Sequence, residues 1–384
     1  MSLIRDRSFL ANAAAHAVVD LINAQRPMLL AVLSVPLGLT NAMVGLIGTA
    51  YTFSGSISQP LFGLLADKIG SRWVVRAGVL WLASMFGLAL VVPGYAALVI
   101  LIMAALGSGA FHPAGTMEAT LLGREQPINR EATAASLFFL FGQSGFAIGP
   151  AIGGALLDHW GPAGLLLLLL VAVPTGFYAG TIRRRPVVPI PDAEKHATLD
   201  AQAPTVRRSL LAFVLLTTFR SWVQMNMITF IPKFFSDLGY RPTLYGAIAT
   251  AYGIGVALGG VAGGTLADRY GKRRVIIASM VLASAMLALF PAAARTPLVF
   301  LVAPLAGAFA GAPHGIIVVL GQRMLPDRVG AASGLVLGFT FASGAVGTLI
   351  SGLQADLVGF DAVFLTTAGI AALGALMAYR LKSD

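Results

Sequence analysis

Long apolar runs separated by short polar gaps make up most of the sequence. A helix that crosses a membrane needs about 20 mostly apolar residues, and the runs here have that length. They cover residues 9–35, 43–65, 73–92, 95–120, 132–156, 161–181, 209–233, 243–266, 274–291, 296–322, 329–352 and 359–379. The pattern predicts an all-α membrane protein with twelve transmembrane helices.

One gap is much longer than the others. Residues 182–208 are polar, rich in proline and basic at both ends, as is typical of a linker. We therefore expect a six-helix bundle over residues 1–181, a cytoplasmic linker over 182–208 and a second six-helix bundle over 209–384.

The two halves repeat each other. GLIGTAY at 45–51 pairs with GAIATAY at 246–252, an offset of 201, and GAFH at 109–112 pairs with GAPH at 311–314. More loosely, GGALLDHWG at 153–161 matches SGLQADLVG at 351–359. A parallel repeat predicts two pseudo-symmetric bundles related by an axis along the membrane normal, with a substrate site between them near mid-membrane.

Charge indicates topology. Only 11% of residues are charged, against about 25% in soluble domains. The net charge of +10 lies in the gaps, so we interpret it as a topology signal and expect no nucleic-acid partner. With both termini in the cytoplasm, 21 of the 26 Lys and Arg fall on the inner side. The first run contains His16 and Asp20 and continues past residue 30, which favours a retained helix over a signal peptide.

Several chemistries are excluded. The chain has no Cys, which rules out disulfides, thiolate metal sites and thiol catalysis. It also contains no HExxH, GxSxG or phosphate-loop motif. We expect no enzyme activity, no cofactor and no metal.

One loop phrase occurs in each half, after the second and eighth runs. Its residues are Gly63, Asp67, Gly70 and Arg72, and again Gly264, Asp268, Gly271 and Arg273. The glycines would permit close helix approach and a tight turn, the bases would hold the loop inside, and the aspartate could cap a neighbouring helix. These residues could gate a conformational switch or only anchor the loop.

With this loop in both halves, the chain resembles the major facilitator superfamily over its full length. The resemblance implies transport by alternating access, in which the two bundles rock about a central site. GFAIGPAIGG at 145–154 is similar to the GPxxGG motif of the antiporter branch, through Gly145, Gly149, Pro150, Gly153 and Gly154. Helix packing by small residues would explain the same motif.

A narrower resemblance, to the fosmidomycin-resistance-type exporters, lies in three segments. They are AHAVVDLINAQRPMLLAVL in the first run, GSGAFHPAG in the fourth and FRSWVQMNMITFIPKFFSDLGY in the seventh. This subgroup implies proton-linked export from the inner membrane. Drug-exporter branches usually have an arginine where this chain has Met103, so proton coupling cannot be transferred from them.

A charge at the bilayer centre costs at least about 2.5–3.5 kcal/mol, so intramembrane charges are candidate functional residues. Asp20 is our first candidate for the proton-titrating group, with His16 one helical turn away and Glu118 as a further candidate. Glu118 lies near the inner loop and could instead be a gate or helix-end residue. Asp20 could also pair structurally with Arg220, which lies at nearly equivalent depth in the repeat.

Arg26 and Arg220 could bind an anion, because a guanidinium suits phosphonate, phosphate or carboxylate. The repeat places these arginines about 10 Å apart in depth, which argues against a shared clamp. Further candidate substrate ligands are Gln224, Asn226, His112 and His314. Either histidine could instead be a packing residue.

The sequence favours a proton-coupled exporter of small organic or drug-like molecules. It would be a multi-pass protein of the bacterial inner membrane with cytoplasmic termini, and a monomer. The alternatives are an organic-anion or sugar-type symporter that uses Arg26 and Arg220, and a membrane sensor or lipid-handling protein that transports no solute.

Overall fold

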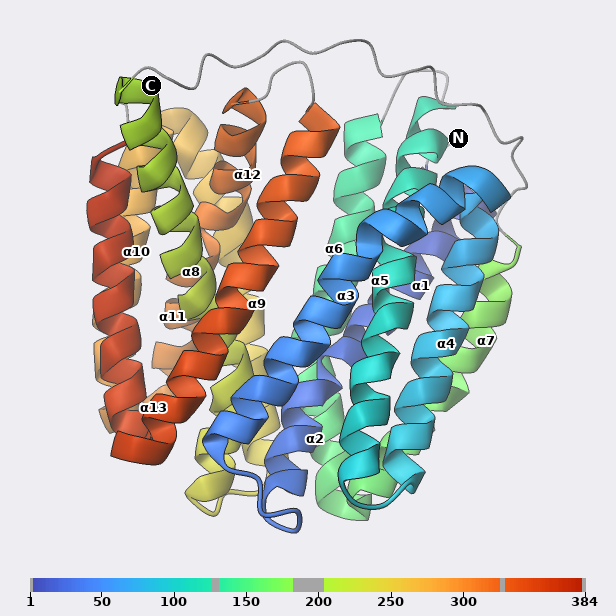
Figure 1. Cartoon of the computed structure of the whole chain (residues 1–384), viewed down its shortest axis with the longest axis horizontal. Coiled ribbons are helices and arrows are strands. Elements are labelled where there is room, and N and C mark those ends of the chain that lie inside the picture. The colour runs from blue at the N-terminus through green and yellow to red at the C-terminus, as the bar shows by residue number, and fades with distance from the viewer. Residues whose placement is uncertain (1–2, 126–130, 182–203, 325–328, 382–384) are drawn as a thin grey trace. The chain divides into compact units, whose positions relative to one another are not determined.

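The computed structural model describes residues 3–125, 131–181, 204–324 and 329–381, and nearly all of them are helical (Figure 1). The first half contains η1 (Leu3–Arg5), α1 (Arg7–Asn23), α2 (Gln25–Ser34), α3 (Asn41–Ile69), α4 (Ser71–Val91), α5 (Tyr95–Arg124), α6 (Glu131–Trp160), η2 (Pro162–Leu168) and α7 (Leu169–Ala179). The second half contains α8 (Pro204–Asp237), α9 (Pro242–Tyr270), α10 (Lys272–Ala293), α11 (Val299–Gly311), α12 (Pro313–Met324) and α13 (Val329–Tyr379).

The twelve predicted apolar runs coincide with these helices. The first run is divided at Ala24 into α1 and α2, and the tenth at Ala312 into α11 and α12. The last two runs lie in α13, which is interrupted at Gly359 by a non-helical φ of 79°. The predicted linker falls largely on residues 182–203, outside the described residues, and α8 already begins at Pro204.

Within the described residues, nine helical stretches are long and apolar enough to span a membrane, and Gly338–Tyr379 holds parts of two predicted runs. The helices α3 and α8 are not among the nine. Ser, Thr and Gln side chains lower the hydropathy of α3, and α8 contains Arg220, Gln224 and Asn226. Polar residues in a membrane-spanning helix indicate candidate functional positions.

The chain forms two compact units. Unit 1 comprises residues 1–38, 50–191 and 240–247, and unit 2 comprises 39–49, 192–239 and 248–384. The first turns of α3 and α9 thus belong to a different unit from the rest of each helix. In unit 1, α4 packs on α5 and α1 on α6, while in unit 2 both α8 and α10 pack on α13.

The repeated loop phrase makes the same turn twice. Gly70 joins α3 to α4 with φ 93° and ψ 138°, and Gly271 joins α9 to α10 with φ 89° and ψ 139°. Only glycine adopts this backbone conformation without strain. The tight turn expected of these two glycines is present in both halves.

Candidate functional site

Two histidines flank Asp20 in unit 1. His16, one turn earlier on α1, places Nε2 3.3 Å from Oδ2 of Asp20. His112 on α5 places Nε2 3.3 Å from Oδ1. Each carboxylate oxygen therefore faces its own imidazole. The spacing of His16 and Asp20 could be predicted from helix periodicity, whereas the contact with His112 depends on how α5 packs against α1.

The other nitrogen of each ring fixes where the hydrogens lie. Nδ1 of His16 is 2.7 Å from the carbonyl oxygen of Phe138, and Nδ1 of His112 is 2.8 Å from that of Ser108. A carbonyl oxygen can only accept, so each Nδ1 donates. In a neutral ring, Nε2 would then have no hydrogen, and its lone pair would face the negatively charged carboxylate. Each contact is favourable only when a proton lies between nitrogen and oxygen.

A polar network extends from the cluster. Asn23 Nδ2 donates to Oδ1 of Asp20 at 3.1 Å and to the hydroxyl of Ser108 at 2.9 Å. Asn23 Oδ1 in turn accepts from the hydroxyl of Tyr51 at 2.7 Å. The network connects α1, α3 and α5 within unit 1. A change of charge at Asp20 therefore alters hydrogen bonds that involve all three helices.

Burial differs within the cluster. The side chain of His16 is 2% exposed and stacks on Phe138 with ring centroids 4.0 Å apart. A side chain at Gly142 would overlap its ring, so α6 leaves the space that His16 fills. Asp20 is 14% exposed and His112 26% exposed. The cluster is therefore closed on the His16 side and accessible on the His112 side.

The ligand atoms of His16, Asp20 and His112 lie within 4.8 Å of one another, a size that a metal ion could also fill. Both nitrogen–oxygen contacts are 3.3 Å long, the separation of an ion pair. We interpret the cluster as one carboxylate between two imidazoles.

Glu118 lies elsewhere in unit 1. It is fully buried on α5 and accepts a hydrogen bond of 2.6 Å from the hydroxyl of Ser71, the first residue of α4. This contact agrees with the helix-end role, and the structure does not bring Glu118 to the Asp20 cluster.

Arg26 is 8% exposed, at the start of α2. Its guanidinium donates to the hydroxyl of Thr52 at 3.1 Å and lies over the ring of Tyr51, 5.0 Å from the centroid. Since Tyr51 also bonds Asn23, Arg26 connects to the Asp20 network through a shared aromatic side chain.

Arg220 is a buried cation on α8 in unit 2, and it is 2% exposed. Its Nε donates to the carbonyl of Ala310 at 3.1 Å and Nη1 lies 3.1 Å from Nδ1 of His314. Because a guanidinium only donates, His314 Nδ1 accepts and its Nε2 holds the hydrogen. Nη2 of Arg220 is buried without a hydrogen-bond partner, and no described carboxylate forms an ion pair with this arginine.

Two further candidates on α8 differ from each other. Asn226 is fully buried and donates to Ser351 at 2.7 Å and Thr367 at 3.0 Å, both on α13. Both bonds join α8 to α13, while Oδ1 of Asn226 is buried without a hydrogen-bond partner, so Asn226 stays a candidate substrate ligand. Gln224 is half-buried and forms no hydrogen bond with a described residue.

The loop aspartates form no caps in the described part of the chain, because neither Asp67 nor Asp268 accepts a hydrogen bond there. The close helix approach expected at Gly63 and Gly264 is also not found. A Cβ at Gly63 would make an ordinary contact, 3.7 Å from Pro113, and one at Gly264 would meet open space. The tight approach is one residue earlier in the second half, where a side chain at Gly263 would overlap the backbone of Ala312.

Two other carboxylates contact the opposite ends of α3 and α9: Asp356 caps the backbone of α3, whereas Asp158 bonds side chains at the start of α9. Asp158 on α6 accepts from Thr243 at 2.6 Å and from Arg241 Nε at 3.1 Å, at the start of α9 in unit 1. Asp356 on α13 accepts the backbone N–H groups of Asn41 at 2.7 Å and Ala42 at 2.8 Å, at the start of α3 in unit 2. These carboxylates stand at matching positions of the loose repeat GGALLDHWG and SGLQADLVG, a signal from which they could have been identified.

The glycines of the GPxxGG-like motif serve close packing. Side chains at Gly145 and Gly153 would overlap the backbone of Ala17 and the amide of Gln25. A side chain at Gly154 would overlap the carbonyl of Pro242, in the segment of α9 that belongs to unit 1. The motif therefore allows α6 to pack closely against α1, α2 and the start of α9. Pro150 lies inside α6.

The model of the Major Facilitator Superfamily matches residues 12–234 and 213–384. The chain belongs to this superfamily. It is 27% identical over 383 residues to the uncharacterized MFS-type transporter YfnC of Bacillus subtilis, with 96% of this chain and 91% of that protein covered. It is 26% identical over 375 residues to the fosmidomycin resistance protein of Escherichia coli, with 94% and 89% covered. The multidrug resistance protein MdtG of Salmonella typhimurium is 24% identical over 361 residues, with 88% and 85% covered.

Solved structures show the same fold. A mutant form of the nucleoside transporter NupG superposes with a TM-score of 0.82 at 15% identity, covering 98% of this chain and all of the other. A bacterial homologue of the lysosomal transporter Spinster, inward-facing and occupied, gives a TM-score of 0.76 at 12% identity, with 99% and 97% covered. The protein is a multi-pass membrane transporter of the major facilitator fold and not an enzyme.

Proposed function

We propose that the protein is a proton-coupled exporter of small organic molecules in the bacterial inner membrane, with both termini in the cytoplasm. The names of two relatives, a fosmidomycin resistance protein and a multidrug resistance protein, support export. The observation that supports proton coupling is the contact of both Asp20 oxygens with histidine nitrogens whose rings already donate through Nδ1.

In this proposal the Asp20 cluster gains a proton from one side of the membrane and releases it to the other. The groups that contact Asp20 are His16, His112 and Asn23. Tyr51 bonds Asn23, and Arg26 lies over the Tyr51 ring. Loss of a proton leaves one lone pair facing the carboxylate, which weakens the link between α1 and α5. A transport cycle can use that change because the same network reaches α3.

The test uses purified protein in proteoliposomes with an imposed pH gradient and a compound panel that includes fosmidomycin. Wild type should accumulate at least one compound against its gradient. Asp20→Asn should lose accumulation yet keep exchange of that compound without a pH gradient. Asp361→Asn is the matched control, because Asp361 is 50% exposed in a surface pair with Arg295. Equal accumulation by wild type and Asp20→Asn would remove Asp20 from coupling.

A second candidate function is transport of organic anions. It is favoured by the buried Nη2 of Arg220, which has no partner, and by Nε2–H of His314, a second donor next to it. A buried cation without a counter-charge is costly, and an anionic substrate would offset that cost. If every anion in the panel moved equally well through wild type and Arg220→Gln, this function would be rejected.

A further inference from the structure

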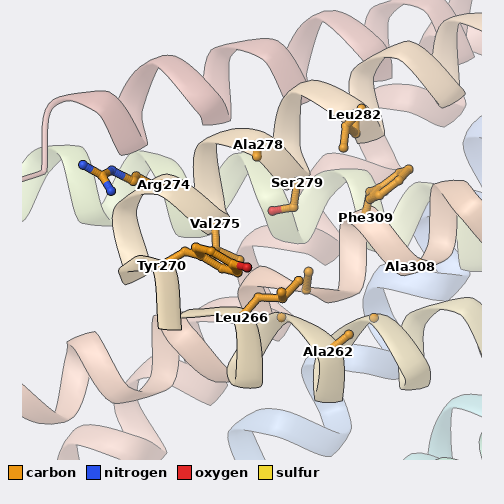
Figure 2. A pocket seen from close by; sticks show the side chains of 13 residues that line it. Ala262, Leu266, Tyr270, Arg274, Val275, Ala278, Ser279, Leu282, Ala308 and Phe309 are labelled. Carbon is orange, nitrogen blue, oxygen red and sulfur yellow. The ribbon is translucent and has the colours of Figure 1, made fainter. Parts of the chain in front are cut away.

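A groove in unit 2 shares no lining residue with the Asp20 cluster or with the contacts of Arg220. It has a volume of about 350 Å³ and runs between α9, α10 and α11. Figure 2 shows Arg274 and Tyr270 toward one end and Leu282 and Phe309 toward the other. Its volume is in the range of small-ligand sites.

Backbone packing opens this groove. Side chains at Gly259 and Gly263 would overlap the backbones of Ala308 and Ala312, so α9 and α11 meet without side chains between them. In the first half, 201 residues earlier, Phe62, Trp73 and Trp81 stand where the second half has Gly263, Arg274 and Leu282. The groove is therefore a property of the second half and not a requirement of the repeat.

The lining is apolar except at one end. Ser279 donates its hydroxyl to the carbonyl of Ile276 at 3.0 Å and is thereby satisfied. At the polar end, Arg274 is exposed, and the Arg269 guanidinium lies over the Tyr270 ring, 5.2 Å from its centroid. Neither arginine forms an ion pair with a described residue. Two cations without an ion-pair partner among the described residues, beside an apolar groove, suit an amphiphile with an anionic head.

The length of the groove along α10 is close to the thickness of the hydrocarbon layer of one lipid leaflet. Arg274 and Leu282 are eight residues apart on α10, a length of about 12 Å. Half of the hydrocarbon core is about 15 Å. The basic end adjoins the loop at Gly271, which the charge pattern places at the cytoplasmic face, and tyrosine is common at that interface. Basic pockets between helices on this side bind anionic headgroups.

We propose that the groove binds one anionic phospholipid, with its phosphate at Arg274 and Arg269 and an acyl chain along Leu266, Leu282 and Phe309. This site is separate from the transport proposal, and it stands whether or not Asp20 couples protons.

The test is native mass spectrometry of the purified protein, titrated with dioleoylphosphatidylglycerol or with dioleoylphosphatidylethanolamine. Wild type should retain one phosphatidylglycerol more tightly than phosphatidylethanolamine. Arg274→Gln should weaken that binding about fivefold. Leu282→Trp, which introduces the residue of the first half, should weaken it while leaving the charges intact.

Lys68→Gln is the matched control, because Lys68 is the repeat equivalent of Arg269 (269 minus 201) and is exposed at the same predicted face. It should leave binding unchanged. The proposal fails if Lys68→Gln weakens binding as much as Arg274→Gln, which would indicate attraction to any surface charge. It also fails if Leu282→Trp has no effect, or if both lipids bind equally in every variant.

Discussion

His112 and His314 occupy equivalent positions of the repeat, 202 residues apart (314 minus 112), and each contacts a buried charge of its own unit. His112 turns Nε2 to the carboxylate of Asp20, whereas His314 accepts from the guanidinium of Arg220 through Nδ1. The equivalent histidine therefore contacts a carboxylate in unit 1 and a guanidinium in unit 2. The two halves share the position of this histidine, but the charge that it contacts has the opposite sign.

The Arg220 site predicts selectivity for charge. Arg220→Gln should weaken binding of an anionic substrate about tenfold or more, because a hydrogen bond to a charged group contributes about 1.5–3 kcal/mol. An uncharged substrate should bind the variant as it binds wild type. Equilibrium binding to purified protein measures both, with Arg295→Gln as an exposed-arginine control. Equal weakening for both substrates would mean that Arg220 only holds α8 in place.

The glycines predict a contrast in stability. Gly145→Ala places a methyl group into the backbone of Ala17, which can yield only if α1 and α6 separate. We expect little monodisperse protein from this variant. Gly264→Ala enters open space on a helix and should be neutral or stabilising by up to about 1 kcal/mol. Thermal unfolding of the purified variants compares them, and two equally stable variants would contradict the packing role of the α6 motif.

Asp158 and Asp356 predict local opening at two helix starts. Asp158→Ala removes the acceptor of the Thr243 hydroxyl and the Arg241 guanidinium. It should weaken the start of α9 by about 1 kcal/mol, a fivefold change in an opening equilibrium. Because the chain has no Cys, a single cysteine at Leu244 can be labelled without background. Maleimide should label it about fivefold faster in Asp158→Ala.

Asp356→Ala should leave labelling at residue 244 unchanged, because it caps α3 in unit 2. If both variants increased the labelling rate equally, the two aspartates would not act locally.

Much of the fold follows from the sequence. The twelve runs, the repeat and the turns at Gly70 and Gly271 depend on hydropathy and backbone conformation, which are local properties. Local patterns also give the pairing of His16 with Asp20, since residues four apart share a helix face.

The rest of the site depends on packing between helices. Spacing along the chain does not reveal that His112 meets Asp20, or that Asn226 donates to Ser351 and Thr367. The expected caps at Asp67 and Asp268 were not found in the described residues, whereas Asp356 does cap α3. A carboxylate can cap only the helix end that tertiary packing brings to it.

The most direct test of proton coupling measures proton movement that is driven by the transported compound. Proteoliposomes containing a pH-sensitive dye and little buffer are given a gradient of a transported compound. The account predicts a substrate-driven pH change inside the vesicles for wild type and Asp361→Asn. It predicts none for Asp20→Asn, although that variant still exchanges the compound. A pH change of wild-type size in Asp20→Asn would contradict the account and leave the Asp20 cluster a structural feature.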